Sequence, residues 1–100
     1  MTQIEVRTEA SDDGWLFTVT VAQGRSQTTH SVAVAREAYD RLSGGACPPE
    51  ELVRLSFQFL LEREPKESVL RQFDITVISR YFPEYEREIR RRVQGSSPSG

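Results

Sequence analysis

The sequence contains one cysteine, one histidine and one lysine, and these shortages rule out several kinds of chemistry. Cys47 has no second cysteine with which it could form an intramolecular disulfide. A structural zinc site usually takes four ligands from Cys and His, and this chain has one of each. Because a lone thiol is typical of a reducing compartment, we predict a cytoplasmic protein without a metal site.

Long apolar runs and glycine-rich loops are also missing. No stretch approaches the roughly 20 apolar residues that cross a bilayer, and the N-terminal MTQIEVRTEA lacks the basic and apolar regions of a secretory signal. The segment SGGACPP has two glycines but neither the lysine nor the spacing of a phosphate-binding loop. We therefore expect no membrane insertion and no cofactor.

The composition is that of one ordinary globular domain, with 100 residues, 37% hydrophobic and 28% charged. The net charge of −2 weighs against a dedicated nucleic-acid binder. Nothing in the C-terminal GSSPSG can contribute to a core. The sequence thus predicts a single α+β domain over residues 1–94 and a disordered tail over residues 95–100.

The first third of the chain alternates apolar and polar residues, as β-strands do. One face of the second segment is β-branched and aromatic: Trp15, Phe17, Val19 and Val21. The turn sequences SDDG and QGR separate this segment from one strand before it and one after it. Connections this short favour three antiparallel strands in sequence order.

From residue 36 the apolar period becomes helical. A short helix is predicted to end at SGG (43–45), and a longer one to begin at ACPPEE, since proline and glutamate suit a first turn. The segment 52–61 is apolar around most of a helix circumference. This pattern indicates a central helix that contacts both the sheet and other helices.

The remaining segments are shorter. After REPKE, a further helical stretch is predicted over residues 65–73. Asp74 is a candidate N-cap for a helix over residues 75–81, for which a short strand is the alternative. Pro83 is expected to begin a last helix, with glutamates at its start and arginines at its end.

Together these segments predict an α+β fold, a three-stranded antiparallel β-meander followed by three to four helices packed on one face. The other face and the edges of such a sheet stay open. Because an edge strand can pair with a second copy of the chain, a homodimer through an extended sheet is one hypothesis.

One segment, residues 49–86, resembles a group of small bacterial proteins that form a domain of unknown function. Its sequence is PEELVRLSFQFLLEREPKESVLRQFDITVISRYFPEYE. The strings FLLEREP and RYFPEYE carry the resemblance. It implies a bacterial cytoplasmic origin, and it implies no activity, cofactor or partner.

A second resemblance concerns DNA binding. VLRQFDITVISRYF is similar to a helix-turn-helix, whose recognition helix would carry Ser79, Arg80 and Tyr81. Asp74 stands where glycine usually makes the turn, the span from Asp74 to Ser79 is about two residues short, and three glutamates follow. A helix-turn-helix-like DNA-binding regulator stays as an alternative function.

Candidate catalytic groups are few. His30 shares a predicted strand face with Val32 and Val34, which favours a hydrogen-bonded structural role over a general base. Cys47 lies just before Pro48, near a predicted helix start that would favour its thiolate. A Cys47–His30 pair would make a thiol-dependent enzyme, the third hypothesis. The sequence favours a non-catalytic protein.

The stretch DITVISRYFPEYEREIRRR (residues 74–92) combines aromatic residues with arginines. On a helix that starts at Pro83, Tyr85, Ile89 and Val93 form one inward stripe, and the arginines face solvent. Pairs four residues apart, Glu86–Arg90 and Glu88–Arg92, are expected to support this helix.

The aromatic residues on either side of Pro83 allow two interpretations. They close the core beneath Pro83, or they form a binding surface, since tyrosine beside arginine is typical of interface hot spots. We predict a protein–protein interaction or self-association module, with Trp15 on the sheet as a second anchor. The predicted partner-binding residues beside Pro83 are Arg80, Tyr81, Phe82, Tyr85 and Arg87.

Overall fold

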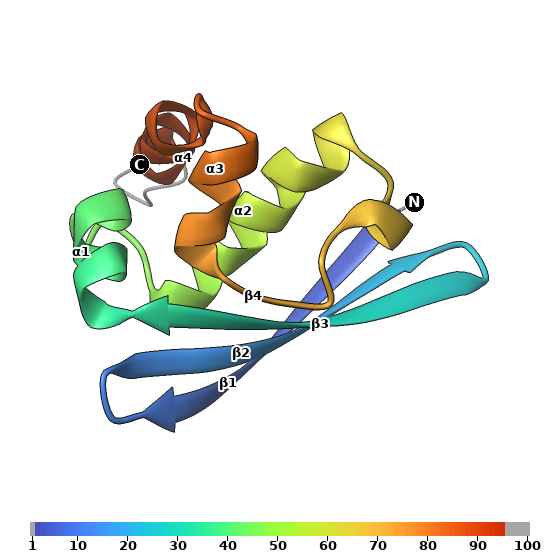
Figure 1. Cartoon of the computed structure of the whole chain (residues 1–100), viewed down its shortest axis with the longest axis horizontal. Coiled ribbons are helices and arrows are strands. Elements are labelled where there is room, and N and C mark those ends of the chain that lie inside the picture. Colours follow the sequence, from blue (N-terminus) through green and yellow to red (C-terminus); the bar gives the residue numbers. More distant parts are fainter. Residues whose placement is uncertain (1, 96–100) are drawn as a thin grey trace.

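Three long strands lie side by side in sequence order (Figure 1). The strands β1 (Thr2–Ser11), β2 (Gly14–Gln23) and β3 (Ser26–Ala35) pair antiparallel without a break in register. The computed structural model describes residues 2–95. The predicted α+β class and the predicted meander are both confirmed.

The turn between β1 and β2 depends on Gly14. Its φ of +155° lies where side chains are disfavoured, and a Cβ there would be 2.1 Å from the carbonyl oxygen of Val34. The same corner is closed by the backbone N–H of Arg36, which donates to the carbonyl of Asp13 at 2.8 Å. Glycine is thus required where the first hairpin meets the end of β3.

Two helices follow the meander. Helix α1 (Arg36–Ser43) ends at Gly44, whose left-handed φ of +61° gives the predicted C-terminal stop. Helix α2 (Pro49–Arg63) starts with proline in its first turn and is buried along most of its length, as the apolar segment 52–61 predicts. All helices cover one face of the sheet, with α2 lying centrally (Figure 1).

The sheet has a fourth strand that the sequence pattern does not reveal. The predicted helical stretch over residues 65–73 is wrong, because only the 3₁₀ turn η1 (Lys66–Ser68) is helical there. The chain then becomes extended, and β4 (Gln72–Asp74) pairs parallel to β3. The free edge of β3 supplies backbone partners for this segment, and a three-residue strand is too short to show an alternating pattern.

Asp74 is the N-cap that its position predicts. Its Oδ1 accepts hydrogen bonds from the backbone N–H of Thr76 at 2.9 Å and from the Thr76 hydroxyl at 2.7 Å. The 3₁₀ turn η2 (Ile75–Val77) and the helix α3 (Ile78–Tyr81) follow, so the helical interpretation of residues 75–81 holds.

The last helix, α4 (Tyr85–Gly95), buries the predicted stripe of Tyr85, Ile89 and Val93. Gly95, predicted to begin the tail, is its final residue. The rest of the predicted tail, residues 96–100, lies outside the described residues.

The ion pairs of α4 are partly those predicted. Arg90 lies 3.8 Å from Glu86. Arg92, however, reaches across to Glu62 of α2 at 2.6 Å, and Glu88 pairs with Arg91 at 3.5 Å. Because α4 packs against α2, a carboxylate distant in the sequence replaces the one four residues away.

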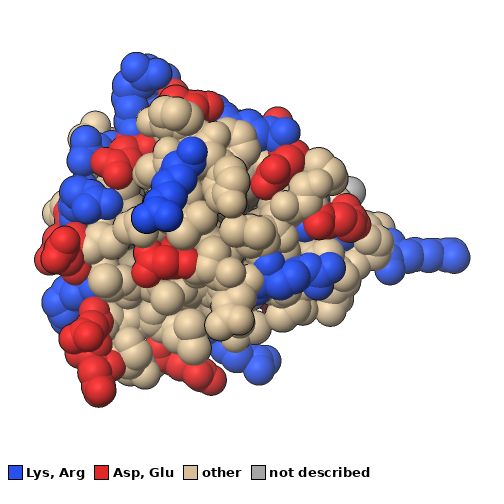
Figure 2. Space-filling model, in the orientation of Figure 1, with Lys and Arg blue, Asp and Glu red and all other residues tan. Residues whose placement is uncertain are grey.

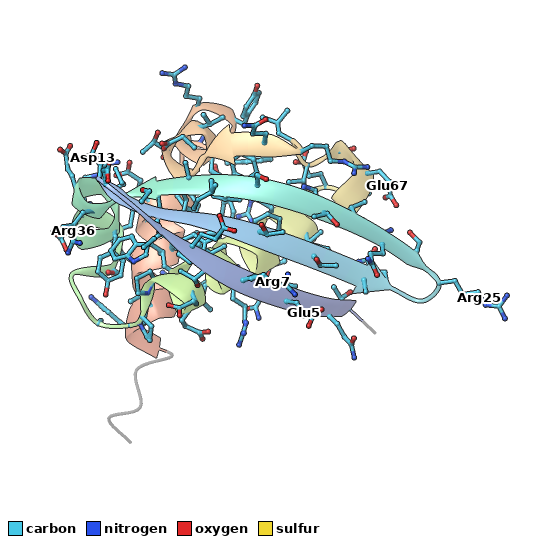
Figure 3. All side chains as sticks on the ribbon, turned by 90° about the horizontal axis from the view of Figure 1, so that it is seen from below. Glu5, Arg7, Asp13, Arg25, Arg36 and Glu67 are labelled. Carbon is cyan, nitrogen blue, oxygen red and sulfur yellow. The ribbon has the colours of Figure 1, made fainter. Side chains whose placement is uncertain are left out.

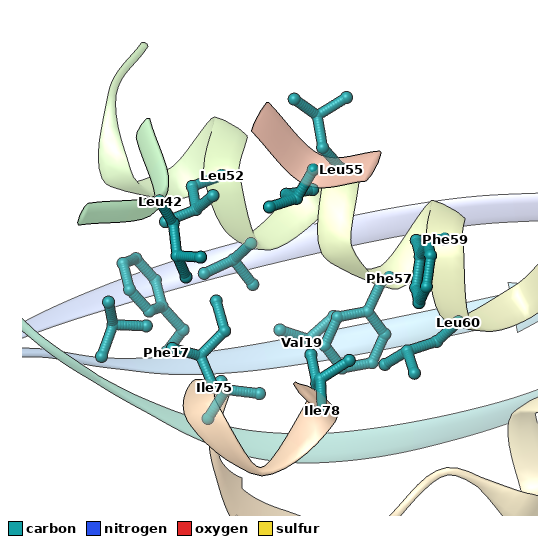
Figure 4. Close-up of a cluster of buried hydrophobic side chains, with 14 of the residues drawn as sticks. Phe17, Val19, Leu42, Leu52, Leu55, Phe57, Phe59, Leu60, Ile75 and Ile78 are labelled. Carbon is teal, nitrogen blue, oxygen red and sulfur yellow. The ribbon is translucent and has the colours of Figure 1, made fainter. Parts of the chain in front are cut away.

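One apolar core lies between the sheet and the helices (Figure 4). Phe17 and Val19 of β2 face α2, which contributes Leu52, Phe57 and other side chains. Ile75 and Ile78 close the core from the β4 side (Figure 4). The segment from η1 to α3 is thereby fixed against the sheet, and its outer surface carries the candidate site.

Candidate functional site

The three aromatic residues beside Pro83 have three different environments. Tyr85 is 0% exposed, and its hydroxyl lies 2.7 Å from Oγ of Ser56. Phe82 is half-buried and packs edge-on against Phe59 with ring centroids 5.8 Å apart. Tyr81 is 65% exposed. Tyr85 therefore lies in the core and is not available to a partner, whereas Tyr81 lies on the surface.

Tyr81 stands at the rim of an apolar depression, which we call the Tyr81 hollow. Its smaller part has a volume of about 30 Å³. A larger part of about 250 Å³ adjoins it and shares four of its lining residues. Nine residues line the smaller part: Leu60, Glu64, Val69, Leu70, Phe73, Val77, Ile78, Tyr81 and Phe82. The smaller part has room for about one methyl group.

Two of the three exposed large apolar residues of the described chain meet at this hollow. Leu70 is 46% exposed and Tyr81 is 65% exposed, and both line its smaller and its larger part. The third, Leu16, is 40% exposed and lies on β2. A gathering of exposed apolar side chains around a depression is typical of binding surfaces, whereas a single exposed leucine is ordinary.

The backbone beneath Leu70 is held by the sheet. Nδ1 of His30 lies 2.8 Å from the carbonyl oxygen of Leu70, and Nε2 lies 2.8 Å from Oγ1 of Thr28. A neutral imidazole protonated on Nδ1 donates to the carbonyl and accepts from the hydroxyl. The neighbouring Ser31 N–H donates to the carbonyl of Arg71 at 2.7 Å. One wall of the hollow is therefore rigidly positioned.

Among the described residues, Glu64 is the one charged residue that lines the hollow, in both its smaller and its larger part. It is half-buried, and no ion pair or hydrogen bond joins its side chain to another residue in the described range. Figure 2 shows that uncharged surface predominates in the middle of this face, where a few charged side chains interrupt it and more lie around it. The site therefore combines an apolar depression with one unneutralised carboxylate.

The other predicted partner-binding residues are dispersed. Arg80 is exposed on α3 next to Tyr81, and Arg87 is exposed on α4. Trp15 lies at the α1 end of the sheet, where its ring packs on Tyr39 at 5.2 Å and beneath the Arg36 guanidinium at 5.3 Å. The structure thus joins Tyr81 and Phe82 in one site but leaves Trp15 outside it.

Sequence reasoning missed Leu70 and Glu64. Leu70 lies in the stretch predicted to be helical. Glu64 has the sequence position of a solvent-exposed residue at the end of a helix. Only the parallel pairing of β4 with β3 brings the segment after η1 back beside α3. No local signal in the sequence marks either residue.

The groups proposed for thiol chemistry do not form a reactive pair. Burial, and secondly the carboxylate of Glu51, raise the pKa of the Cys47 thiol. Both ring nitrogens of His30 are engaged with Thr28 and Leu70. Since a reactive cysteine needs a lowered pKa, this environment gives the enzyme hypothesis no support.

The remaining alternatives also gain nothing from the geometry. Ser79, Arg80 and Tyr81 lie on a helix of four residues, about one turn, which is short for a helix that reads a DNA groove. Within residues 2–95, no three Cys, His, Asp or Glu side chains gather as metal ligands would. No helix in that range has the length and apolar character needed to cross a membrane.

Comparison of the chain with models of protein families, with curated proteins and with solved structures finds no match. The resemblance to a bacterial domain of unknown function therefore stays a prediction. The function has to be argued from the site itself.

Proposed function

We propose that this chain is a non-catalytic binding domain that recognises another protein through the Tyr81 hollow. The observation that carries the proposal is the convergence of exposed Leu70 and Tyr81 on one apolar depression. Burying such side chains releases water from apolar surface and stabilises a complex by about 25 cal/mol per Å² of apolar area. Because Leu70 and Tyr81 stay exposed in the folded chain, this free energy is gained when a partner buries them.

The occupant that fits is an apolar side chain of a partner protein beside a lysine or arginine. The smaller part of the hollow has room for a methyl group, and the larger part beside it has room for the rest of an apolar side chain. The unpaired carboxylate of Glu64 at the same site favours a basic neighbour. Tyrosine supplies contact area at a low cost in conformational entropy, which suits Tyr81 to the rim.

A random peptide library selected on the wild-type chain and counter-selected on Tyr81→Ala tests the proposal. We expect peptides with an apolar residue adjacent to Lys or Arg, whose binding shifts the NMR signals of Leu70, Tyr81 and Phe82. Glu64→Gln is expected to remove the preference for the basic residue while keeping the apolar one. Leu16→Ala is the matched control, because Leu16 is similarly exposed but lies on β2, away from the hollow.

The stability of the variants separates binding from folding. Tyr81→Ala is expected to change the free energy of unfolding by about 0.5 kcal/mol or less, as exposed positions do. Peptides that bind Tyr81→Ala as well as the wild type would refute the proposed site, and so would a Tyr81→Ala chain that fails to fold.

A further inference from the structure

The outer edge of β1 is long and unprotected. The strand has ten residues, contains neither proline nor glycine, and pairs in continuous register with β2 on its inner side. No other strand of the described chain covers its outer side. Natural proteins usually shorten, bend or cover such an edge, because its free N–H and C=O groups attract another strand.

The backbone groups that face outward can be identified from the register. Ser31 of β3 directs its N–H to Arg71 on the β4 side, so the residues of β3 with even numbers face β2. The registers of β2 with β3 and of β1 with β2 then show that the backbone N–H and C=O groups of Glu5 and Arg7 point towards β2. The outward groups therefore belong to residues with even numbers: Thr2, Ile4, Val6, Thr8 and Ala10.

The side chains of β1 are arranged in two rows. Glu5 and Arg7 follow one another on the sheet face that carries no helices, at the outer strand (Figure 3). Ile4 and Val6 point to the helix side and stay half-buried. A strand from another molecule would thus meet a charged row on one face and an apolar row on the other.

Only some registers of β1 with a second copy allow hydrogen bonds between the two backbones. In these registers, residues whose N–H and C=O groups face outward lie opposite each other. A two-fold pairing centred on Arg7 places Arg7 against Arg7 of the second copy, and one centred on Glu5 places two glutamates together. Centring on Val6 instead sets Glu5 opposite Arg7 of the second copy, twice. Opposite charges across strands stabilise a pair, and like charges destabilise it.

The Val6-centred register also extends the apolar contacts of the sheet. It sets Ile4 opposite Thr8 of the second copy, beside a hollow between β1 and α2 that Ile4 and Leu61 line. Because the two-fold axis is perpendicular to the sheet, both helix layers lie on the same side. The half-buried apolar row of each β1 then continues into that of the other.

We propose that two copies of this chain associate through antiparallel pairing of their β1 edges, centred on Val6. The product is one continuous sheet made of two four-stranded sheets. The charges at positions 5 and 7 favour this register over those centred on Glu5 or Arg7. A register centred on Thr8 would set Arg7 opposite Glu9 of the second copy and pair only residues 5–11, so Glu9→Arg distinguishes it from the Val6-centred one. This surface is separate from the Tyr81 hollow and does not depend on it.

Charge exchange at the edge provides the test, with dimerisation measured by sedimentation equilibrium. Glu5→Arg and Arg7→Glu each place two like-charged pairs across the seam, and we expect each to weaken dimerisation roughly tenfold or more. Mixing the two variants restores opposite charges, so a heterodimer of near wild-type affinity is expected. Glu9→Arg is the matched control, because it makes the same charge change opposite Gln3 of the second copy.

The backbone gives a second readout. Amide exchange at Ile4, Val6 and Thr8 is expected to slow as the protein concentration rises, while the amides of Glu5 and Arg7 stay protected throughout. A wild-type chain that remains monomeric up to about 1 mM would overturn the proposal. Single variants that dimerise as the wild type does, or a mixture that shows no recovery, would overturn it equally.

Discussion

The hydroxyl of Tyr85 lies 2.7 Å from Oγ of Ser56, and this buried contact joins α4 to α2. Ser56 donates its own proton to the carbonyl oxygen of Leu52 at 2.8 Å. The Tyr85 hydroxyl is therefore the donor to Ser56, and burial, the largest cause, raises the pKa of Tyr85 so that it keeps this proton. The two helices are thus joined by a directional bond within an apolar core.

Removing the donor or the acceptor of this hydrogen bond is expected to lower the free energy of unfolding by different amounts. Tyr85→Phe removes the donor and leaves Ser56 bonded to Leu52, so a cost of about 0.5–1.5 kcal/mol is expected. Ser56→Ala leaves the buried Tyr85 hydroxyl without an acceptor, at a cost of about 1–3 kcal/mol. Urea unfolding measures both free energies. A smaller loss for Ser56→Ala than for Tyr85→Phe would contradict the assigned donor.

His30 is expected to make stability depend on pH near neutrality. Burial, the largest cause, and the positive charge of Arg71 lower its pKa below the ordinary 6.5, although the hydrogen bond to Leu70 acts in the opposite direction. The unfolded chain therefore takes up the proton first as the pH falls. The contribution to stability is complete above pH 6.5 and is lost below it.

Urea unfolding at a series of pH values measures this loss, with His30→Gln as the variant that cannot titrate. The wild type should lose stability as the pH falls below about 6.5, and the variant should not show this loss. The lowered pKa values of Glu62, Glu67 and Glu84 act in a separate window, below their ordinary 4.5. An identical pH dependence in both proteins would show that His30 titrates normally.

Gly14 and Gly24 should respond differently to alanine. A Cβ at Gly14 would collide with the backbone of Val34, whereas one at Gly24 meets nothing within 4 Å. Gly24→Ala is expected to cost about 1–2 kcal/mol, the strain of a left-handed alanine. Gly14→Ala must also displace β3, so thermal unfolding should show a larger loss. Equal losses would mean that the corner is not tightly packed.

Cys47 is expected to react slowly with iodoacetamide at pH 7, because its thiol is buried and its pKa is raised. Glutathione serves as the reference thiol, and the chain unfolded in urea should react at the rate of an ordinary cysteine. Faster reaction in the folded state than in urea would revive the hypothesis of a thiol-dependent enzyme.

Local patterns in the sequence were sufficient for much of the architecture. The alternation across 15–22 determined a strand, the turn sequences determined the meander, and the apolar segment 52–61 determined a central helix. Asp74 marked a helix start because capping acts over two or three residues. Tyr85 could be placed on the buried stripe of α4 by its spacing from Ile89 and Val93.

Tertiary structure alone decided the rest, for a physical reason. β4 exists because β3 offers a free edge, and a pairing between residues 31–33 and 72–74 leaves no trace in either segment alone. The same pairing fixes the segment that carries Leu70, whereas Glu64 comes from the end of α2, so the candidate site could not be assembled from the sequence. Spacing along the chain determines which face of an element is apolar, whereas the packing of distant elements determines which apolar residues stay exposed.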